Sequence, residues 1–271
     1  MEINGYALEF MSESQRMDRQ LVMAAVRQAG GALRHASVAL RADEAVVREA
    51  VRQDGLALEF AHEQLQASPQ LAYEAAAQNI SAMKFAPSAL RADRSFVLRC
   101  LRHSTFALNF AADALRGDRE FIVEAIKQDG IGGRDGLILQ YSTQALQSDP
   151  DMLLLAMRRS VSALRLVPRE LMEDRRFVLR ALQQTPCALR FASARLLEDR
   201  AFVVEAVRKR GACLECCPER FRSDREVVIE AVTSDRAALA FASEELRGDG
   251  ALLSDVNRRV RLAQLAEEDT E

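Results

Sequence analysis

The amino-acid sequence predicts an all-α protein, a right-handed solenoid of about ten layers that each take up 25 residues. Three observations lead to this prediction. An Asp followed three residues later by an apolar residue recurs every 25 residues along most of the 271-residue chain. The apolar residues inside each repeat fall at helical spacing and do not alternate. One repeat is also too short to bury both faces of its helices, so it must stack on neighbours of the same kind.

Ten repeat starts can be located, nine at Asp and one at Ser. Consecutive starts are 25 residues apart, except that the interval from Asp118 to Asp149 is 31. The six extra residues correspond to 131–136, IGGRDG, which we expect to form a surface loop. The starts are Asp18, Asp43, Ser68, Asp93, Asp118, Asp149, Asp174, Asp199, Asp224 and Asp249.

We expect the first part of each repeat to be an α-helix of about 11 residues. The Asp at position one is a good N-cap, because its carboxylate accepts hydrogen bonds from the free N–H groups of the first turn. Apolar residues follow at positions four, five and eight, as in Phe121, Ile122 and Ala125. Position eight is usually Ala, which lets neighbouring helices approach closely. Glycines after the helix suit a left-handed C-cap; they are Gly30, Gly55, Gly130 and Gly211.

The second part of each repeat follows the pattern x-A-L-x-F-A-S-x-x-L, as in residues 187–196. Two slots that are mostly Leu recur seven residues apart, and a Ser, Thr or Pro between them can start a new turn. We expect a short α-helix that breaks into a 3₁₀ turn or a second small helix. A β-strand is the weaker interpretation, because the apolar residues do not alternate.

The repeats divide the chain into three parts. Residues 1–17 are expected to form an N-terminal half-repeat cap, in which the polar Gln15 occupies a slot that Leu fills elsewhere. Residues 18–248 are expected to form one continuous repeat solenoid, with the loop insertion at 131–136. Residues 249–271 depart from the pattern and predict a C-terminal capping helix with an acidic tail.

The repeated sequence resembles the domain-of-unknown-function 4116 helical repeat family. Residues 174–182, DRRFVLRAL, and residues 199–207, DRAFVVEAV, carry the resemblance together with the second pattern of the repeat. A domain of this family is about two repeats long, so the resemblance implies four to five copies across nearly the whole chain. It implies a helical repeat fold and no established activity, so no catalytic residue is carried over.

Composition argues against several function classes. The 37 Lys and Arg against 40 Asp and Glu leave a net charge of −3, which is not the basic footprint of a nucleic-acid-binding protein. No apolar stretch reaches the roughly 18 residues of a membrane span, and the start of the chain does not resemble a secretory signal. Five cysteines without a regular framework favour reduced thiols. We therefore expect a cytoplasmic protein with no membrane span, no bound nucleic acid and no small-molecule substrate.

Cysteines at 213–217, CLECC, are the strongest candidates for chemistry. Thiolates at this spacing can hold zinc or an iron–sulfur centre, so a metal-bearing or enzymatic module is an alternative function. Cys213, Cys216 and Cys217 nevertheless occupy slots that Ala or aromatic residues fill in other repeats. We therefore interpret them as core residues and expect no metal, no cofactor and no catalytic residue. The three histidines are scattered over different repeat positions, at His35, His62 and His103.

A partner-binding surface is the remaining candidate site. Position six lies away from the centre of the buried face, yet it is a large aliphatic residue in six successive repeats. These residues could form an apolar stripe that binds a partner, or the stacking of helices could cover them. Arg134 and Asp135 at the tip of the inserted loop could add a contact. The stripe consists of Leu98, Val123, Leu154, Leu179, Val204 and Ile229.

Arginines in the middle of the chain, among them Arg99, Arg175 and Arg180, lack obvious acidic neighbours in the sequence and could form a basic patch for an acidic protein. We accordingly expect a non-catalytic protein–protein interaction scaffold or an accessory subunit of a larger assembly, because solenoids present extended surfaces. A nucleic-acid-binding repeat protein is a further alternative.

Overall fold

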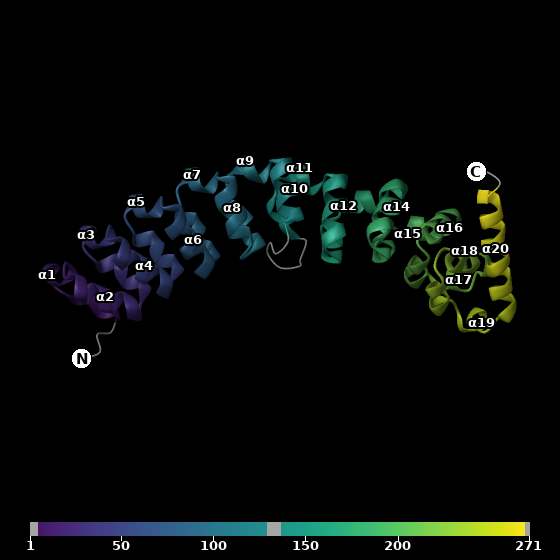
Figure 1. Cartoon of the computed structure of the whole chain (residues 1–271), viewed down its shortest axis with the longest axis horizontal. Helices are drawn as coiled ribbons and strands as arrows, with labels where there is room; N and C mark the ends of the chain where they lie inside the picture. The colour runs from purple at the N-terminus through teal and green to yellow at the C-terminus, as the bar shows by residue number, and fades with distance from the viewer. Residues whose placement is uncertain (1–4, 129–136, 269–271) are drawn as a thin grey trace. The chain divides into compact units, whose positions relative to one another are not determined.

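The computed structural model of the protein describes residues 5–128 and 137–268. Within these ranges every regular element is a helix. A repeat contains one α-helix of eight to ten residues, then a 3₁₀ helix, and then an α-helix of four or five residues (Figure 1). The predicted all-α repeat fold is therefore confirmed. Among these residues no helix is both long enough and apolar enough to cross a membrane.

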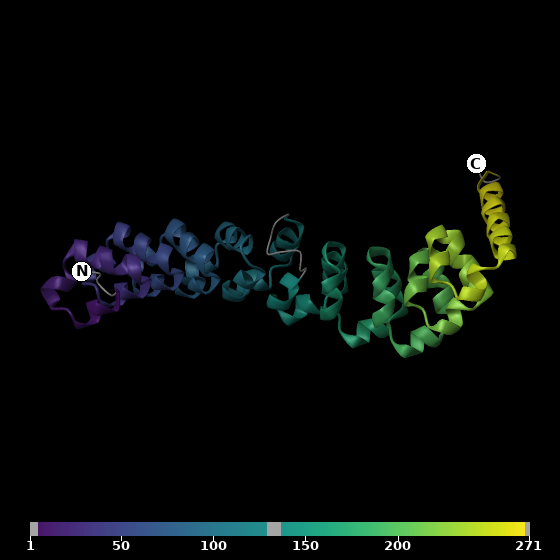
Figure 2. The same cartoon turned by 90° about the horizontal axis from the view of Figure 1, so that it is seen from below.

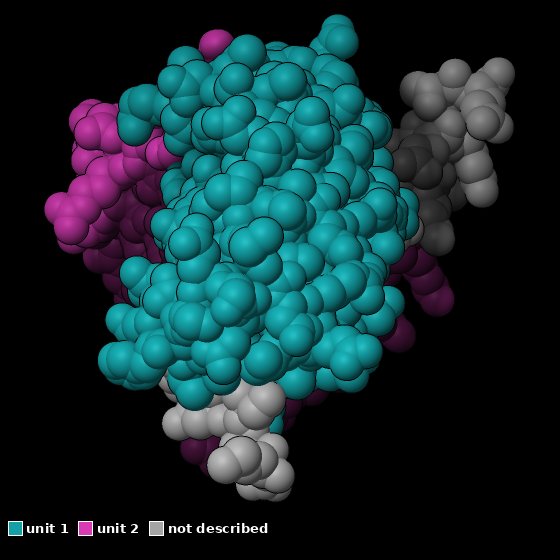
Figure 3. Space-filling view, turned by 90° about the vertical axis from the view of Figure 1, so that its left-hand side faces the viewer, with its two compact units in different colours: residues 1–146 teal, residues 147–271 magenta. Residues whose placement is uncertain are grey.

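The chain forms two compact units, residues 1–146 and residues 147–271 (Figure 3). The boundary falls in the same repeat as the six-residue insertion at 131–136, which lies outside the described residues. That residues 18–248 form one continuous solenoid stays a prediction.

The first unit contains five long α-helices, each at the start of a repeat: α2 (Arg19–Gln28), α4 (Glu44–Gln53), α6 (Pro69–Gln78), α8 (Arg94–Leu101) and α10 (Arg119–Lys127). Its described 3₁₀ helices are η1 (Gly5–Phe10), η2 (Gly30–His35), η3 (Gly55–Phe60), η4 (Ile80–Phe85), η5 (Thr105–Phe110) and η7 (Leu137–Tyr141). The short α-helices are α1 (Glu13–Arg16), α3 (Val38–Arg41), α5 (Glu63–Gln66), α7 (Ser88–Arg91), α9 (Asp113–Arg116) and α11 (Gln144–Gln147), which ends just past the boundary.

The second unit has the same order of elements and ends in a longer helix. Its long helices are α12 (Pro150–Arg159), α14 (Arg175–Gln184), α16 (Arg200–Lys209), α18 (Arg225–Ser234) and the terminal α20 (Gly250–Glu268). Its 3₁₀ helices are η8 (Val161–Leu166), η9 (Pro186–Phe191), η10 (Gly211–Cys216) and η11 (Arg236–Phe241). The short helices are α13 (Arg169–Glu173), α15 (Ala194–Glu198), α17 (Glu219–Arg222) and α19 (Glu244–Arg247).

Equivalent elements of adjacent repeats stack on one another inside each unit. In the first unit α4 packs between α2 and α6, and η3 packs between η2 and η4 (Figures 1 and 2). In the second unit α16 packs between α14 and α18 in the same way. The position-eight residue is buried in all ten repeats, as expected for a residue at this contact: Ala25, Ala50, Ala75, Cys100, Ala125, Ala156, Ala181, Ala206, Ala231 and Val256.

Two details of the predicted repeat were wrong. The 3₁₀ helix comes before the short α-helix and not after it. The Ser, Thr or Pro between the two Leu slots lies at the start of the short α-helix. The Ala-Leu segment before it therefore forms the 3₁₀ helix, which has the tighter turn. The glycines do not form left-handed C-caps either. The C-cap of α2 is Ala29 in an extended conformation, φ −145°, and Gly30 is the first residue of η2.

Close approach between repeats explains these glycines. A Cβ on Gly30 would lie 2.5 Å from the carbonyl oxygen of Ala50 in the next repeat. A Cβ on Gly55 or Gly211 would lie at least as close to the carbonyl oxygen of Ala75 or Ala231. Gly130 lies outside the described residues.

The side chain of Gln53, in the next repeat, forms hydrogen bonds with the backbone at and before Gly30. The Gly30 N–H donates to Oε1 of Gln53 at 2.6 Å, and Nε2 of Gln53 donates to the carbonyl of Gln28 at 3.2 Å. Gly55 and Gln78 repeat the first contact one layer later, also at 2.6 Å. Glycine at these positions therefore serves the packing of one repeat on the next.

Candidate functional site

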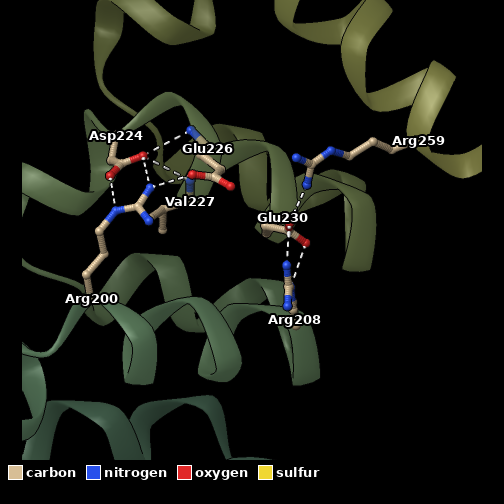
Figure 4. A network of polar contacts seen from close by, with 7 residues as sticks. All are labelled: Arg200, Arg208, Asp224, Glu226, Val227, Glu230 and Arg259. Carbon is tan, nitrogen blue, oxygen red and sulfur yellow. Dashed lines mark hydrogen bonds and ion pairs between the residues drawn. The ribbon is translucent and has the colours of Figure 1, made fainter.

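An ion pair connects the helix caps of adjacent repeats. Oδ1 of Asp224 accepts hydrogen bonds from the backbone N–H groups of Glu226 and Val227 at 3.0 and 3.2 Å, which caps α18. Oδ2 of the same carboxylate accepts from Nε of Arg200 in the preceding repeat at 2.9 Å (Figure 4). We call this pair the layer link; it joins Arg19 to Asp43, Arg94 to Asp118, Arg175 to Asp199, Arg200 to Asp224 and Arg225 to Asp249.

The arginine of the layer link was missed from the sequence, although the dipeptide Asp-Arg recurs there. In most links the arginine also binds a second carboxylate, as Arg200 does with Glu226 at 2.8 Å and Arg175 with Glu205 at 2.7 Å. The hydrogen bond from Arg200 holds the pKa of the Asp224 carboxyl below its ordinary value of 3.8. The layer link therefore stabilises the stacking of repeats and is a structural feature.

Two arginines of the predicted basic patch, Arg175 and Arg180, are neutralised by carboxylates. Arg175 binds two carboxylates, and Arg180 donates to Oδ1 of Asp151 at 2.6 Å across adjacent long helices. Arg99 stacks on the ring of Tyr73 at 4.0 Å from its centroid. The sequence did not show the carboxylates that bind Arg175 and Arg180, because these lie 24 to 30 residues away along the chain.

Two of the three clustered cysteines lie in the packed interior, as the sequence predicted. Cys213 and Cys217 are buried, and burial raises the pKa of each thiol to about 12. Cys216 is half-buried. In the part of the chain that the structure describes, no three His, Cys, Asp or Glu side chains are grouped so that they could hold a metal ion.

The three histidines do not come together. His62 caps α5 through Nδ1, which accepts the N–H of Gln64 at 3.4 Å. His103 contacts the hydroxyl of Tyr73 through Nε2 at 2.9 Å. His35 is half-buried at the end of η2, and burial lowers the pKa of its imidazole.

Three of the six residues at position six are buried and three are half-buried. Leu154, Leu179 and Ile229 are between 6% and 8% exposed, so the expected apolar stripe is wrong for these three. Leu98, Val123 and Val204 are half-buried, and their role in partner binding stays a prediction. The predicted loop contacts Arg134 and Asp135 lie outside the described residues.

A row of partly exposed rings follows the ends of the 3₁₀ helices. The last residue of each 3₁₀ helix is an aromatic side chain except at two positions, and the 3₁₀ helices stack on one another within each unit. The side chains are half-buried, while Phe10 and Phe191 are 85% and 45% exposed. We call this row the 3₁₀ ridge; it consists of Phe10, His35, Phe60, Phe85, Phe110 and Tyr141 in the first unit and Leu166, Phe191, Cys216 and Phe241 in the second.

Cations and further rings accompany the ridge in the first unit. The Arg34 guanidinium lies 5.7 Å from the ring centroid of Phe60, and Nζ of Lys84 lies 4.6 Å from that of Phe85. Phe106 packs edge-on against Phe110 and Tyr141, with ring centroids 5.1 and 5.4 Å apart. The sequence motif contains this aromatic position, but it was interpreted as core, because periodicity cannot separate a half-covered position from a buried one.

A groove of about 500 Å³ opens beside the ridge in the second unit. It lies between two adjacent repeats, with η8 and α13 on one side and η9 on the other. Leu164 and Met172 are its buried apolar residues, and Phe191 of the ridge forms its far wall. Arg165 and Arg169 are exposed at its rim.

The family model described as Domain of unknown function (DUF4116) matches the chain in six segments that together cover well over half of it. The chain belongs to the DUF4116 family. The matched segments are residues 1–41, 43–91, 93–132, 149–197, 174–216 and 199–247. Comparison with curated proteins and with solved structures found no match.

Each DUF4116 segment spans about two repeats, as the resemblance implied. Segment 174–216 overlaps both 149–197 and 199–247, because every repeat presents the same pattern and a DUF4116 match can begin at successive repeats. The groove beside the ridge falls inside the DUF4116 segment 149–197. The description of DUF4116 names no activity, so a function must be argued from the surface.

Proposed function

We propose that this protein is a non-catalytic protein–protein interaction scaffold, or an accessory subunit of a larger assembly, and that it binds its partner along the 3₁₀ ridge. The observation that carries the proposal is the recurrence of a half-exposed ring at the same place in adjacent repeats. Aromatic side chains dominate the energetics of protein interfaces, because a rigid ring buries a large apolar area with little loss of conformational freedom.

The chemistry of the ridge favours a protein partner. Two cations, Arg34 and Lys84, lie against rings of the ridge, so this part of it can bury apolar side chains of a partner and pair its carboxylates. The arginines of the layer links already hold carboxylates, which supports a protein partner over the phosphates of a nucleic acid. The five cysteines form no disulfide, which supports a cytoplasmic site of action.

The test is affinity capture with the full chain from an extract of the source organism, followed by mass spectrometry. The ridge variant carries Phe60→Ser and Phe85→Ser, and the control variant carries Arg52→Ser on the exposed face of α4. We expect the ridge variant to lose a partner that both the wild-type chain and the control capture. Circular dichroism must show that the ridge variant stays folded.

The affinity of the identified partner should then fall at least about tenfold in the ridge variant, the effect of removing a hot spot. Equal capture by the folded ridge variant and the wild-type chain would contradict the proposal.

A further inference from the structure

One position of the repeat changes from polar to apolar beside the groove and again in the repeat that follows it. The residue two places before each cap is polar in most repeats. We call it the pre-cap residue. It is Arg16, Arg41, Arg91, Arg116, Arg222 or Arg247 in six repeats, Gln66 or Gln147 in two, and Met172 or Leu197 in the remaining two.

Polar pre-cap residues fold back over the end of the 3₁₀ helix in their own repeat. Nη2 of Arg16 donates to the carbonyl of Glu9 at 2.6 Å, and Nε of Arg91 donates to that of Ala86 at 3.2 Å. Nε2 of Gln66 donates to the carbonyl of Glu59 at 3.0 Å. These carbonyls have no partner inside the helix, so the pre-cap side chain both satisfies them and fills the space beside the ridge.

Other pre-cap arginines also fill the space beside the ridge, although their Nε atoms form no hydrogen bond with a described residue. The Nε atoms of the pre-cap residues Arg41, Arg116 and Arg222 are buried. The repeat that starts at Asp149 has Met172 instead, which has no N–H to donate and is 6% exposed. Met172 lies with Leu164 in the groove, next to Phe191. At the groove, the thioether of Met172 therefore takes the position that an arginine or glutamine has in eight other repeats.

The rim of this groove is cationic. Arg165 and Arg169 line it and are exposed, and the structure gives neither of them an ion pair with a described residue. Arg190, exposed beside Phe191 in η9, adds a third positive charge close to the ridge. Glu173 is the acidic residue of the lining. The groove therefore combines an apolar floor with a net positive rim.

We propose that this groove binds an acidic peptide segment of a partner protein through one large apolar anchor residue. Charge complementarity with Arg165 and Arg169 selects the acidic flanks of the peptide, while Leu164, Met172 and Phe191 take up the anchor. A volume of about 500 Å³ is in the range of small ligand sites and holds one or two side chains. The inference rests on the proposed function, because it assigns a peptide class to one part of the 3₁₀ ridge.

The experiment uses the purified full chain and three sets of fluorescent peptides of seven residues. The first set has acidic flanks around a central Leu, Phe or Met, the second replaces the central residue by Ala, and the third replaces the acidic residues by Lys. We expect binding of the first set alone, weakening as salt concentration rises. Absence of binding by the first set, or equal binding of the second or third, would overturn the proposal.

Substitutions locate the binding site. Met172→Arg restores the pre-cap residue of other repeats and should reduce peptide affinity at least about tenfold. Leu197→Arg makes the same change in the next repeat, where the pre-cap residue does not line the groove, and should leave affinity unchanged. If Met172→Arg does not fold, the exposed charge reversals Arg165→Glu and Arg169→Glu replace it, with the same expected loss.

Two further probes separate other occupants. An oligothymidylate that binds as tightly as the acidic peptides would show that the rim recognises negative charge alone. A dimer in sedimentation that Met172→Arg dissociates would show that a second copy occupies the groove. Either result rejects the peptide proposal.

The outcome also separates this proposal from the proposed function. If the Phe60 and Phe85 variant loses its partner while no acidic peptide binds the groove, the scaffold function stands and the groove proposal fails. If acidic peptides bind the groove while the ridge variant retains every partner, the groove proposal stands and the broader ridge is not the interface.

Discussion

Arg200 in α16 donates from Nε to Oδ2 of Asp224, 2.9 Å away, while Oδ1 of the same carboxylate caps α18. One aspartate thus accepts hydrogen bonds from the first turn of its own helix and forms an ion pair with the preceding repeat. The two functions of the carboxylate can be separated, because some repeats have the cap without the arginine.

The first prediction compares two caps in adjacent repeats. Asp174 caps α14 through the N–H of Arg176 at 2.7 Å, and it has no layer link because Pro150 occupies the place of the arginine. Asp199 caps α16 and also accepts from Arg175 at 3.0 Å. We expect Asp174→Ala to lower the free energy of unfolding by about 1 kcal/mol, and Asp199→Ala to lower it by roughly 0.5–1 kcal/mol more.

Urea denaturation of the two variants measures this difference. Asp199→Ser is the control, because it keeps a cap and removes only the link. Equal destabilisation by Asp174→Ala and Asp199→Ala would show that the link contributes nothing to stability.

The second prediction concerns the contact between α18 and the terminal helix α20. Glu230 is 9% exposed and accepts hydrogen bonds from Arg208 at 2.9 and 2.8 Å and from Arg259 of α20 (Figure 4). These donors hold the pKa of the Glu230 carboxyl below its ordinary value of 4.5. We expect Glu230→Gln to lower the free energy of unfolding by about 2 kcal/mol at neutral pH.

The pH dependence has a definite sign. A carboxyl group whose pKa is lower in the folded state stabilises the fold above its unfolded pKa, and this contribution disappears as the pH falls through the folded pKa. The stability gap between the wild-type chain and Glu230→Gln should therefore be full above pH 5 and narrow steadily below pH 4.5. Denaturation curves at several pH values check this, with the exposed Glu215→Gln as control; a gap that does not change with pH would contradict it.

The third prediction uses two adjacent glycines. A Cβ at Gly30 would lie 2.5 Å from the carbonyl oxygen of Ala50, whereas a Cβ at Gly31 meets nothing within 4 Å. Gly30→Ala should lower the free energy of unfolding by roughly 1–3 kcal/mol, because the repeats must move apart. Gly31→Ala should be neutral or stabilising by up to about 1 kcal/mol, since it restricts the unfolded chain. Thermal melts that rank the two variants in the opposite order would refute the packing role of Gly30.

The fourth prediction concerns the thiols. Burial raises the pKa of Cys213 to about 12, and only the thiolate reacts with disulfide reagents. Cys213 should therefore react slowly in the folded protein at pH 8 and quickly in urea, as followed by absorbance with single-cysteine variants. The half-buried Cys187 serves as the comparison and should react faster. Fast reaction of native Cys213 would show that this segment opens readily.

Much of the architecture was predictable from residues that lie close together in the sequence. The cap at Asp174, the helix that follows it and the buried Ala181 are all set by local hydrogen bonding and by helical spacing within one repeat. The 25-residue interval then required that equivalent elements stack, which the structure confirms. The family resemblance was confirmed for the same reason, since it depends on the same motif.

Contacts between repeats were decided by the tertiary structure alone. The sequence cannot show that Arg175 reaches Asp199, that Gly30 faces the carbonyl of Ala50, or that a neighbouring helix covers Leu179. Each depends on how closely and at what offset one repeat packs on the next. A groove forms at Met172 for the same physical reason: the residue is one apolar side chain in the sequence, and only the adjacent repeat supplies the opposite wall.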